Sequence, residues 1–214
     1  MSINPQNFYI SVIDLFSIII PGGIATIVLY HNFGDTIDSI FVIDKNVTNY
    51  LWAILLLYSY ILGHVIFQIG SYLDRPIYDR WKGNRNADLI AEIKNIRGDV
   101  TTKIIKSNHD WAYFYLISIK SPILEEVNRK MADSKFFRSL FVISLGLIVL
   151  YPCKMIFSKD DKETWPILFV MSILLAIFSC WSYLKLRNKS SKTAYEFVIF
   201  HESIKDQLPK PSSN

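Results

Sequence analysis

The sequence predicts an all-α integral membrane protein with four transmembrane helices and a small helical cytoplasmic subdomain. Three observations predict this fold class. Apolar residues make up 51% of the 214-residue chain, they gather in four blocks, and charged residues are almost absent from those blocks. Each block has the roughly 20 residues that an α-helix needs to cross the hydrocarbon layer of a bilayer. This composition excludes disordered chains, collagen-like chains and disulfide-rich scaffolds.

We expect the four spans at residues 10–30, 50–72, 139–157 and 165–184. Buried helices of a soluble bundle would carry an apolar stripe on one side only, whereas the second and fourth blocks are apolar nearly all round. The first block does not match a cleaved signal peptide. Residues 1–10 contain no Lys or Arg, and no small-residue cleavage pattern follows Tyr30.

The distribution of cations predicts the orientation of the spans. Nineteen of the 23 lysines and arginines lie either in residues 73–138 or after Leu184. Because loops rich in Lys and Arg stay in the cytoplasm, both termini and the long loop should be cytoplasmic. The predicted organisation is spans one and two with a short periplasmic loop (10–72), a basic cytoplasmic helical insert (73–138), spans three and four (139–184), and a cytoplasmic C-terminal helix and tail (185–214).

Local signals predict helices outside the membrane as well. Asn86 is a candidate cap for a helix over 86–96, and Gly98 would close that helix. Residues 109–120 fit a strand or a buried helix, and their helical neighbours favour the helix. Ser121 and Pro122 should begin one helix that continues as the third span, and the fourth span should continue toward Lys205.

Catalytic motifs are missing from the sequence. It contains no Walker A motif, no G-x-G-x-x-G, no G-x-S-x-G and no H-E-x-x-H, and its four histidines do not have the spacing of metal ligands. We therefore predict a non-enzymatic protein without a metal or other cofactor.

Polar residues occur within the first two spans. His64 and Gln68 lie one turn apart in the second span, and antiparallel packing would bring Asp14 of the first span to nearly the depth of Gln68. An ionisable residue at membrane depth is a candidate functional residue. The simpler alternative is that Asp14, His64 and Gln68 form hydrogen bonds that hold the two spans together.

Pro21, Gly22 and Gly23 lie halfway along the first span, where they predict a kink or a broken helix. A kink could act as a hinge or line a pore. Alternatively, it could serve only to pack the span against the glycines of the second span.

The insert mixes cations and acids around aromatic residues, which is typical of a surface that binds a partner protein. Trp81, Trp111 and Tyr113 are the candidate anchors. The alternative is that these side chains form the insert's own core. The insert has no separate basic face of the kind that would indicate direct binding to nucleic acid.

The chain resembles the membrane component of the Kiwa anti-phage defence system, or a related small defence-associated membrane protein. The features that carry this resemblance are Asp14, Pro21-Gly22-Gly23, Gly63-His64, Gly70 and the helical insert before the third span. The resemblance covers nearly the whole chain in size and layout. It implies a multi-pass protein of the bacterial inner membrane that forms a homo-oligomer, with a tetramer as the expected state. It also implies a sensor or scaffold that contacts membrane lipids and signals to a soluble cytoplasmic DNA-binding effector.

The alternative function is a membrane-perturbing or channel-forming defence effector. A pore needs a polar stripe through the whole bilayer, and the outer halves of the second, third and fourth spans are Leu, Ile, Val and Phe. The sequence therefore favours the sensor or scaffold. A lipid- or envelope-modifying enzyme is a third possibility, which the missing catalytic residues disfavour.

Overall fold

A computed structural model describes residues 5–40, 51–82, 86–102, 105, 107–157 and 164–207 of the chain. Every regular element in these ranges is helical, as the sequence predicts. The elements are α1 (Pro5–Ile40), α2 (Leu51–Tyr72), the π-helical turn η2 (Asp74–Asp79), α3 (Arg80–Lys82), α4 (Ala87–Thr102), α5 (Asn108–Ser118), α6 (Ile123–Phe157) and α7 (Thr164–Gln207).

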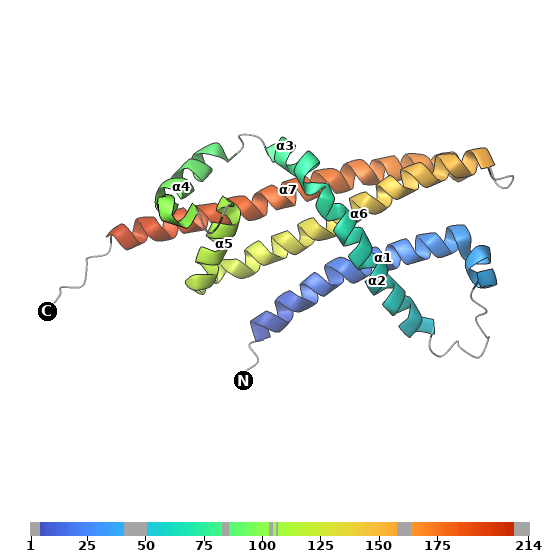
Figure 1. The fold of residues 1–214 in the computed structure, drawn as a ribbon, viewed down its shortest axis with the longest axis horizontal. Helices are drawn as coiled ribbons and strands as arrows, with labels where there is room; N and C mark the ends of the chain where they lie inside the picture. Colours follow the sequence, from blue (N-terminus) through green and yellow to red (C-terminus); the bar gives the residue numbers. More distant parts are fainter. Residues whose placement is uncertain are drawn as a thin grey trace.

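Helices α6 and α7 lie side by side along the length of the molecule (Figure 1). The prediction of one long helix after Ser121 is confirmed: the Ile123 N–H donates to the Ser121 Oγ at 3.3 Å and begins α6. The prediction that the fourth span continues to Lys205 is also confirmed. Small side chains let the two backbones approach closely. The buried serines on these helices are Ser134, Ser139, Ser144, Ser172, Ser179, Ser182, Ser190 and Ser191.

Helix α1 is longer than the predicted span and changes direction near its C-terminal end. Phe33 leaves helical geometry (φ −135°, ψ 15°), whereas residues 21–23 keep it. The Lys154 Nζ donates to the Asn32 carbonyl at 2.8 Å and lies over the rings of Phe33 and Trp165. The ammonium group thus satisfies a carbonyl at the break and joins the ends of α1, α6 and α7.

The insert contains α4 and α5, which pack on α7. The helix favoured over 109–120 is confirmed as α5. It ends because Lys120 adopts a left-handed conformation (φ +50°), which lets the Lys120 and Ser121 N–H groups bond the carbonyls of Ile117 and Leu116, both at 3.0 Å. Gly98 (φ +67°) interrupts α4 where the sequence predicts an end.

The core of the insert joins the parts of α6 and α7 that extend beyond the predicted spans; these two parts are called the stalk below. Its fully buried members come from α4, α5, α6 and α7: Ile93, Ala112, Leu116, Val127, Ala194, Tyr195 and Val198. The Asn86 side-chain amide, expected at a helix cap, donates to Asn188 Oδ1 of α7 at 2.8 Å. The insert is therefore fastened to the stalk by polar as well as apolar contacts.

Among the described residues, four helices are long and apolar enough to cross a membrane: α1, α2, α6 and α7. The beginning of α1 and the end of α7 both lie toward the end of the molecule that carries α4 and α5 (Figure 1). The chain is thus compatible with a multi-pass membrane protein. The assignment of that end to the cytoplasm still rests on the distribution of cations.

This orientation predicts opposite labelling of two engineered cysteines, Ser118→Cys in α5 and Thr164→Cys at the start of α7. Both positions are exposed. In a background with Cys153→Ser and Cys180→Ala, a membrane-impermeant maleimide should label Thr164→Cys in intact cells. It should label Ser118→Cys only after the cells are opened. The reverse pattern would show that the insert lies outside.

Candidate functional site

His64 and Gln68 lie on a face of α2 that points away from the rest of the chain. Both side chains are exposed, whereas the face packed against α1 and α6 contains Gly63, Ile66 and Gly70. The imidazole of His64 meets the ring of Tyr60 edge-on, with centroids 4.5 Å apart. The side chain of Asp14 lies outside the described residues, so its expected hydrogen bond with His64 or Gln68 stays a prediction.

The Pro21-Gly22-Gly23 segment marks the closest approach of α1 and α2. A Cβ atom on Gly22 would overlap the Ser59 carbonyl, and a Cβ atom on Gly63 would overlap the carbonyl of Ile18. A Cβ atom on Gly23 would meet the Ser59 Oγ at an ordinary 3.5 Å. Gly22 and Gly63 are thus the small residues that let the two backbones touch. The sequence predicts a kink or broken helix at this segment, but its residues keep helical geometry and α1 leaves that geometry at Phe33 instead. The close contact fits the packing interpretation of the segment.

A partly buried ion pair joins three helices near the end of α2. The Arg138 guanidinium of α6 donates to Asp74 at 2.7 Å, and the hydroxyl of Tyr183 in α7 donates to the other oxygen of the same carboxylate. The Arg138 side chain is only 8% exposed. Its guanidinium also lies over the ring of Phe67, 4.7 Å from the centroid. The Asp74 side chain is 32% exposed, so the burial to be compensated is that of Arg138, and the opposite charge and hydrogen bond of Asp74 make it tolerable.

The sequence interpretation missed this ion pair, because it counted Asp74 and Arg138 only as charges of a loop. Asp74 begins the π-helical turn η2, two residues after α2 ends, and Arg138 directly precedes the predicted third span. Two opposite charges at the same predicted membrane boundary were the available signal.

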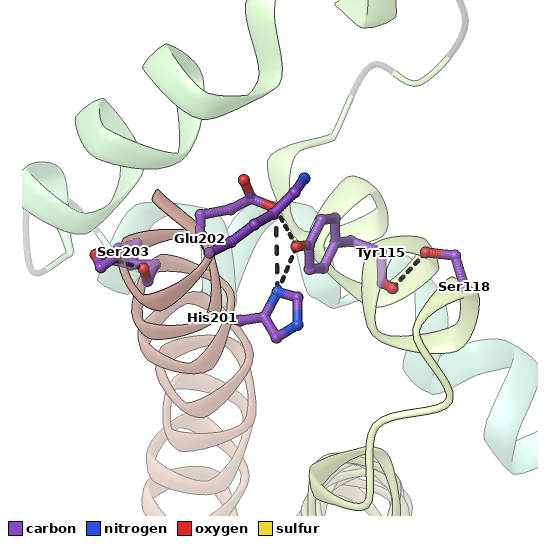
Figure 2. Close-up of polar contacts among 7 residues, drawn as sticks. Tyr115, Ser118, His201, Glu202 and Ser203 are labelled. Carbon is purple, nitrogen blue, oxygen red and sulfur yellow. Dashed lines mark hydrogen bonds and ion pairs between the residues drawn. The ribbon is translucent and has the colours of Figure 1, made fainter. Parts of the chain in front are cut away.

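A second polar cluster joins α5 to the C-terminal part of α7 (Figure 2). The Tyr115 hydroxyl of α5 is 2.7 Å from the Nδ1 of His201 and donates to the carboxylate of Glu202, both on α7. The Lys205 Nζ lies 3.6 Å from the same carboxylate. The hydroxyl has one proton, which goes to Glu202, so we infer that His201 carries a proton on Nδ1 and donates to the Tyr115 oxygen.

The electrostatics of this cluster favour a structural role. Burial, then the hydrogen bond to Glu202 and its negative charge, raise the pKa of the Tyr115 hydroxyl above its ordinary value. A phenol held in its neutral form is a poor nucleophile or base. Within the described ranges, no group of three or more His, Cys, Asp or Glu side chains could hold a metal ion. The cluster's evident effect is to fasten α5 to α7.

The three aromatic residues expected to anchor a partner are at least partly buried. Trp111 and Tyr113 pack against the core of the insert, and the Tyr113 hydroxyl donates to Asn128 Oδ1 at 2.9 Å. Trp81 packs with Tyr78 and Tyr183 beside the ion pair. This arrangement fits the alternative in which these side chains form the insert's own core. The large apolar side chains exposed in this region are instead Phe114, Ile117, Phe200 and Ile204.

The chain has no recognisable relatives in the comparisons with known proteins: no family model matches it, and neither a curated protein nor a solved structure is significantly similar to it.

The contact at Gly22 predicts that Gly22→Ala destabilises the protein, whereas Gly23→Ala does not. The added methyl at Gly22 would force α1 away from α2, with a cost of about 1–3 kcal/mol. At Gly23 the methyl has room, and alanine favours the helix. Thermal unfolding in detergent compares the two variants, and equal melting temperatures would contradict the close contact.

The ion pair predicts that Arg138→Met costs about 1–3 kcal/mol, because it leaves the partly exposed Asp74 carboxylate without its cation. Arg129→Met is the matched control: Arg129 is exposed on the same helix, and its replacement should change stability by less than about 0.5 kcal/mol. Unfolding in mixed micelles measures both. A similar small change in the two variants would show that Asp74 does not depend on Arg138.

Proposed function

We propose that this chain is a non-enzymatic membrane scaffold that senses a change in the bilayer or in an infecting phage and signals to a soluble cytoplasmic partner. The observation that carries the proposal is the continuity of α6 and α7. Each helix runs without interruption from its apolar segment into the insert, where both contribute to one core with α4 and α5.

The contacts of the insert support signalling through α7. The Tyr115 hydroxyl connects α5 to His201 and Glu202, and the Lys130 Nζ of α6 donates to Thr193 Oγ1 of α7 at 2.8 Å. The Glu126 carboxylate, also on α6, lies 2.5 Å from the Nζ of Lys130 and pairs with its charge. With these polar contacts around an apolar core, the insert should follow any movement of the stalk.

The exposed apolar side chains of the insert are the proposed contact for the partner. Phe114 is 54% exposed and Phe200 60% exposed, although both lie beyond the predicted membrane-spanning segments. Large apolar side chains that face water are typical of protein interaction sites. They replace Trp111 and Tyr113 as the anchors that we propose.

The resemblance to the Kiwa membrane component leads us to propose anti-phage defence as the setting. The bacterial inner membrane is the proposed location, a homo-oligomer (a tetramer in that family) the proposed assembly, and a DNA-binding effector the proposed partner. The alternative, a membrane-perturbing or channel-forming effector, differs in a measurable way because it would act without a partner.

The test is expression of the chain in a phage-sensitive bacterium, with and without the soluble protein encoded beside it. We expect protection from infection, measured by plaque counts, only when both are present. Phe114→Ala should weaken binding of the soluble protein by about tenfold or more, as loss of a central anchor does. Ser118→Ala, an exposed change on the same helix, should leave binding intact.

Two outcomes would overturn the proposal, and a third would overturn its partner surface. Protection by the chain alone, accompanied by ion conductance of reconstituted vesicles, would favour the channel. No protection in either form would remove the defence setting. Equal binding by the two variants would exclude Phe114 as part of the partner surface.

A further inference from the structure

The exposed face of α2 carries a regular pattern. Leu57, Ile61, His64, Gln68 and Ser71 recur at alternating spacings of four and three residues, so they form one seam along the helix. Leu57 is 59% exposed and Ile61 52% exposed. At 100° per residue this seam lies opposite the face that packs on α1 and α6. Nothing in the described part of the chain covers it.

Three members of the seam are polar, and His64 is the one that lies deepest within the predicted span. His64 lies eight residues before the end of α2 at Tyr72, or about 12 Å inside that end of the helix. Within the described part of the chain, the side chains of His64 and Gln68 have no hydrogen-bond partner; His64 meets only the edge of the Tyr60 ring. Such groups in lipid are costly unless another helix supplies a partner.

We propose that this seam binds the same seam of a second copy of the chain, across a two-fold axis parallel to the membrane normal. The proposal rests on the membrane-embedded homo-oligomer of the proposed function and identifies one contact within it. A two-fold contact joins two copies, so a tetramer would be a pair of such dimers. Rotation about such an axis keeps every residue at its own depth, so each side chain meets its own copy.

Only certain polar groups can pair with their own copy. A glutamine amide both donates and accepts, and so does a neutral imidazole, whereas two carboxylates or two ammonium groups would repel each other. The polar residues of the seam, His64, Gln68 and Ser71, are therefore of the self-complementary kind, since a hydroxyl also donates and accepts. Leu57 and Ile61 would pack outside them, toward the start of α2.

The spacing also sets the packing angle. Alternating steps of four and three residues are typical of left-handed helix pairs that cross at about 20°. The polar positions would fix the register, because a shifted pair would leave the amide and the imidazole facing apolar side chains. The seam thus favours one pairing among those that its apolar residues alone would permit.

The test is oxidative cross-linking of single cysteines in lipid vesicles, in the Cys153→Ser, Cys180→Ala background. Leu57→Cys lies on the seam, and Tyr58→Cys, the adjacent residue at nearly the same depth, lies about 100° around the helix. Both positions are exposed, at 59% and 48%. We expect Leu57→Cys to give a product of twice the chain's mass and Tyr58→Cys to give little.

A second arm tests the polar pairing. Adding Gln68→Leu to Leu57→Cys should weaken self-association about three- to tenfold on dilution into lipid, as expected for one interhelical hydrogen bond. Ile69→Leu, an exposed change off the seam, should have no effect. His64→Leu should act in the same direction as Gln68→Leu.

Several results would overturn the inference. These are equal cross-linking of the two cysteines, no cross-linking of either, a product in native membranes whose mass is not twice that of the chain, and unchanged association in both polar variants. None of them bears on the partner contact at Phe114. A failure of this inference is therefore distinguishable from a failure of the proposed function.

Discussion

The ion pair between Arg138 and Asp74 is the constraint on which the arrangement of the membrane helices depends. A buried charge is tolerated only when an opposite charge and hydrogen bonds replace its water. Asp74 satisfies this need for Arg138 and at the same time accepts from Tyr183. The end of α2 must therefore meet α6 and α7 at one level. The ion pair therefore attaches the end of α2 to α6 and α7. At the opposite ends of α6 and α7, Lys154 joins them to α1. The α1–α2 pair is thus attached to the α6–α7 pair at both ends.

The features predicted from the sequence are those that local physics determines. The existence of four spans follows from their apolar length, and the start of α6 follows from Ser121 and Pro122. The continuation of α7 into the insert follows from the lack of a helix breaker between Pro166 and Pro209. Each of these signals lies within one continuous stretch of the chain, so a single sequence is enough to show it.

The features that escaped prediction depend on contacts between distant segments. Arg138 and Asp74 are 64 residues apart, and nothing local pairs them. In a membrane helix the packed and lipid-facing residues are both apolar, so the sequence does not reveal which face of α2 packs. The aromatic residues of the insert had two equally plausible roles, and only the core around Leu116 and Tyr195 indicates which role Trp111 and Tyr113 have. Asp14 remains the untested member of the predicted polar cluster.

The length of α7 has a mechanical consequence. Its 44 residues make a rod of about 66 Å, of which the hydrocarbon layer accounts for only about 30 Å. About 35 Å of rigid helix therefore projects beyond the bilayer as a lever arm. If α7 tilts by about 10°, well within the range seen for membrane helices, its far end sweeps roughly 6 Å sideways. A small change in bilayer thickness or in helix crossing angle would thus reach the aqueous end as a displacement larger than a hydrogen bond can span, without any change in the conformation of the helix itself.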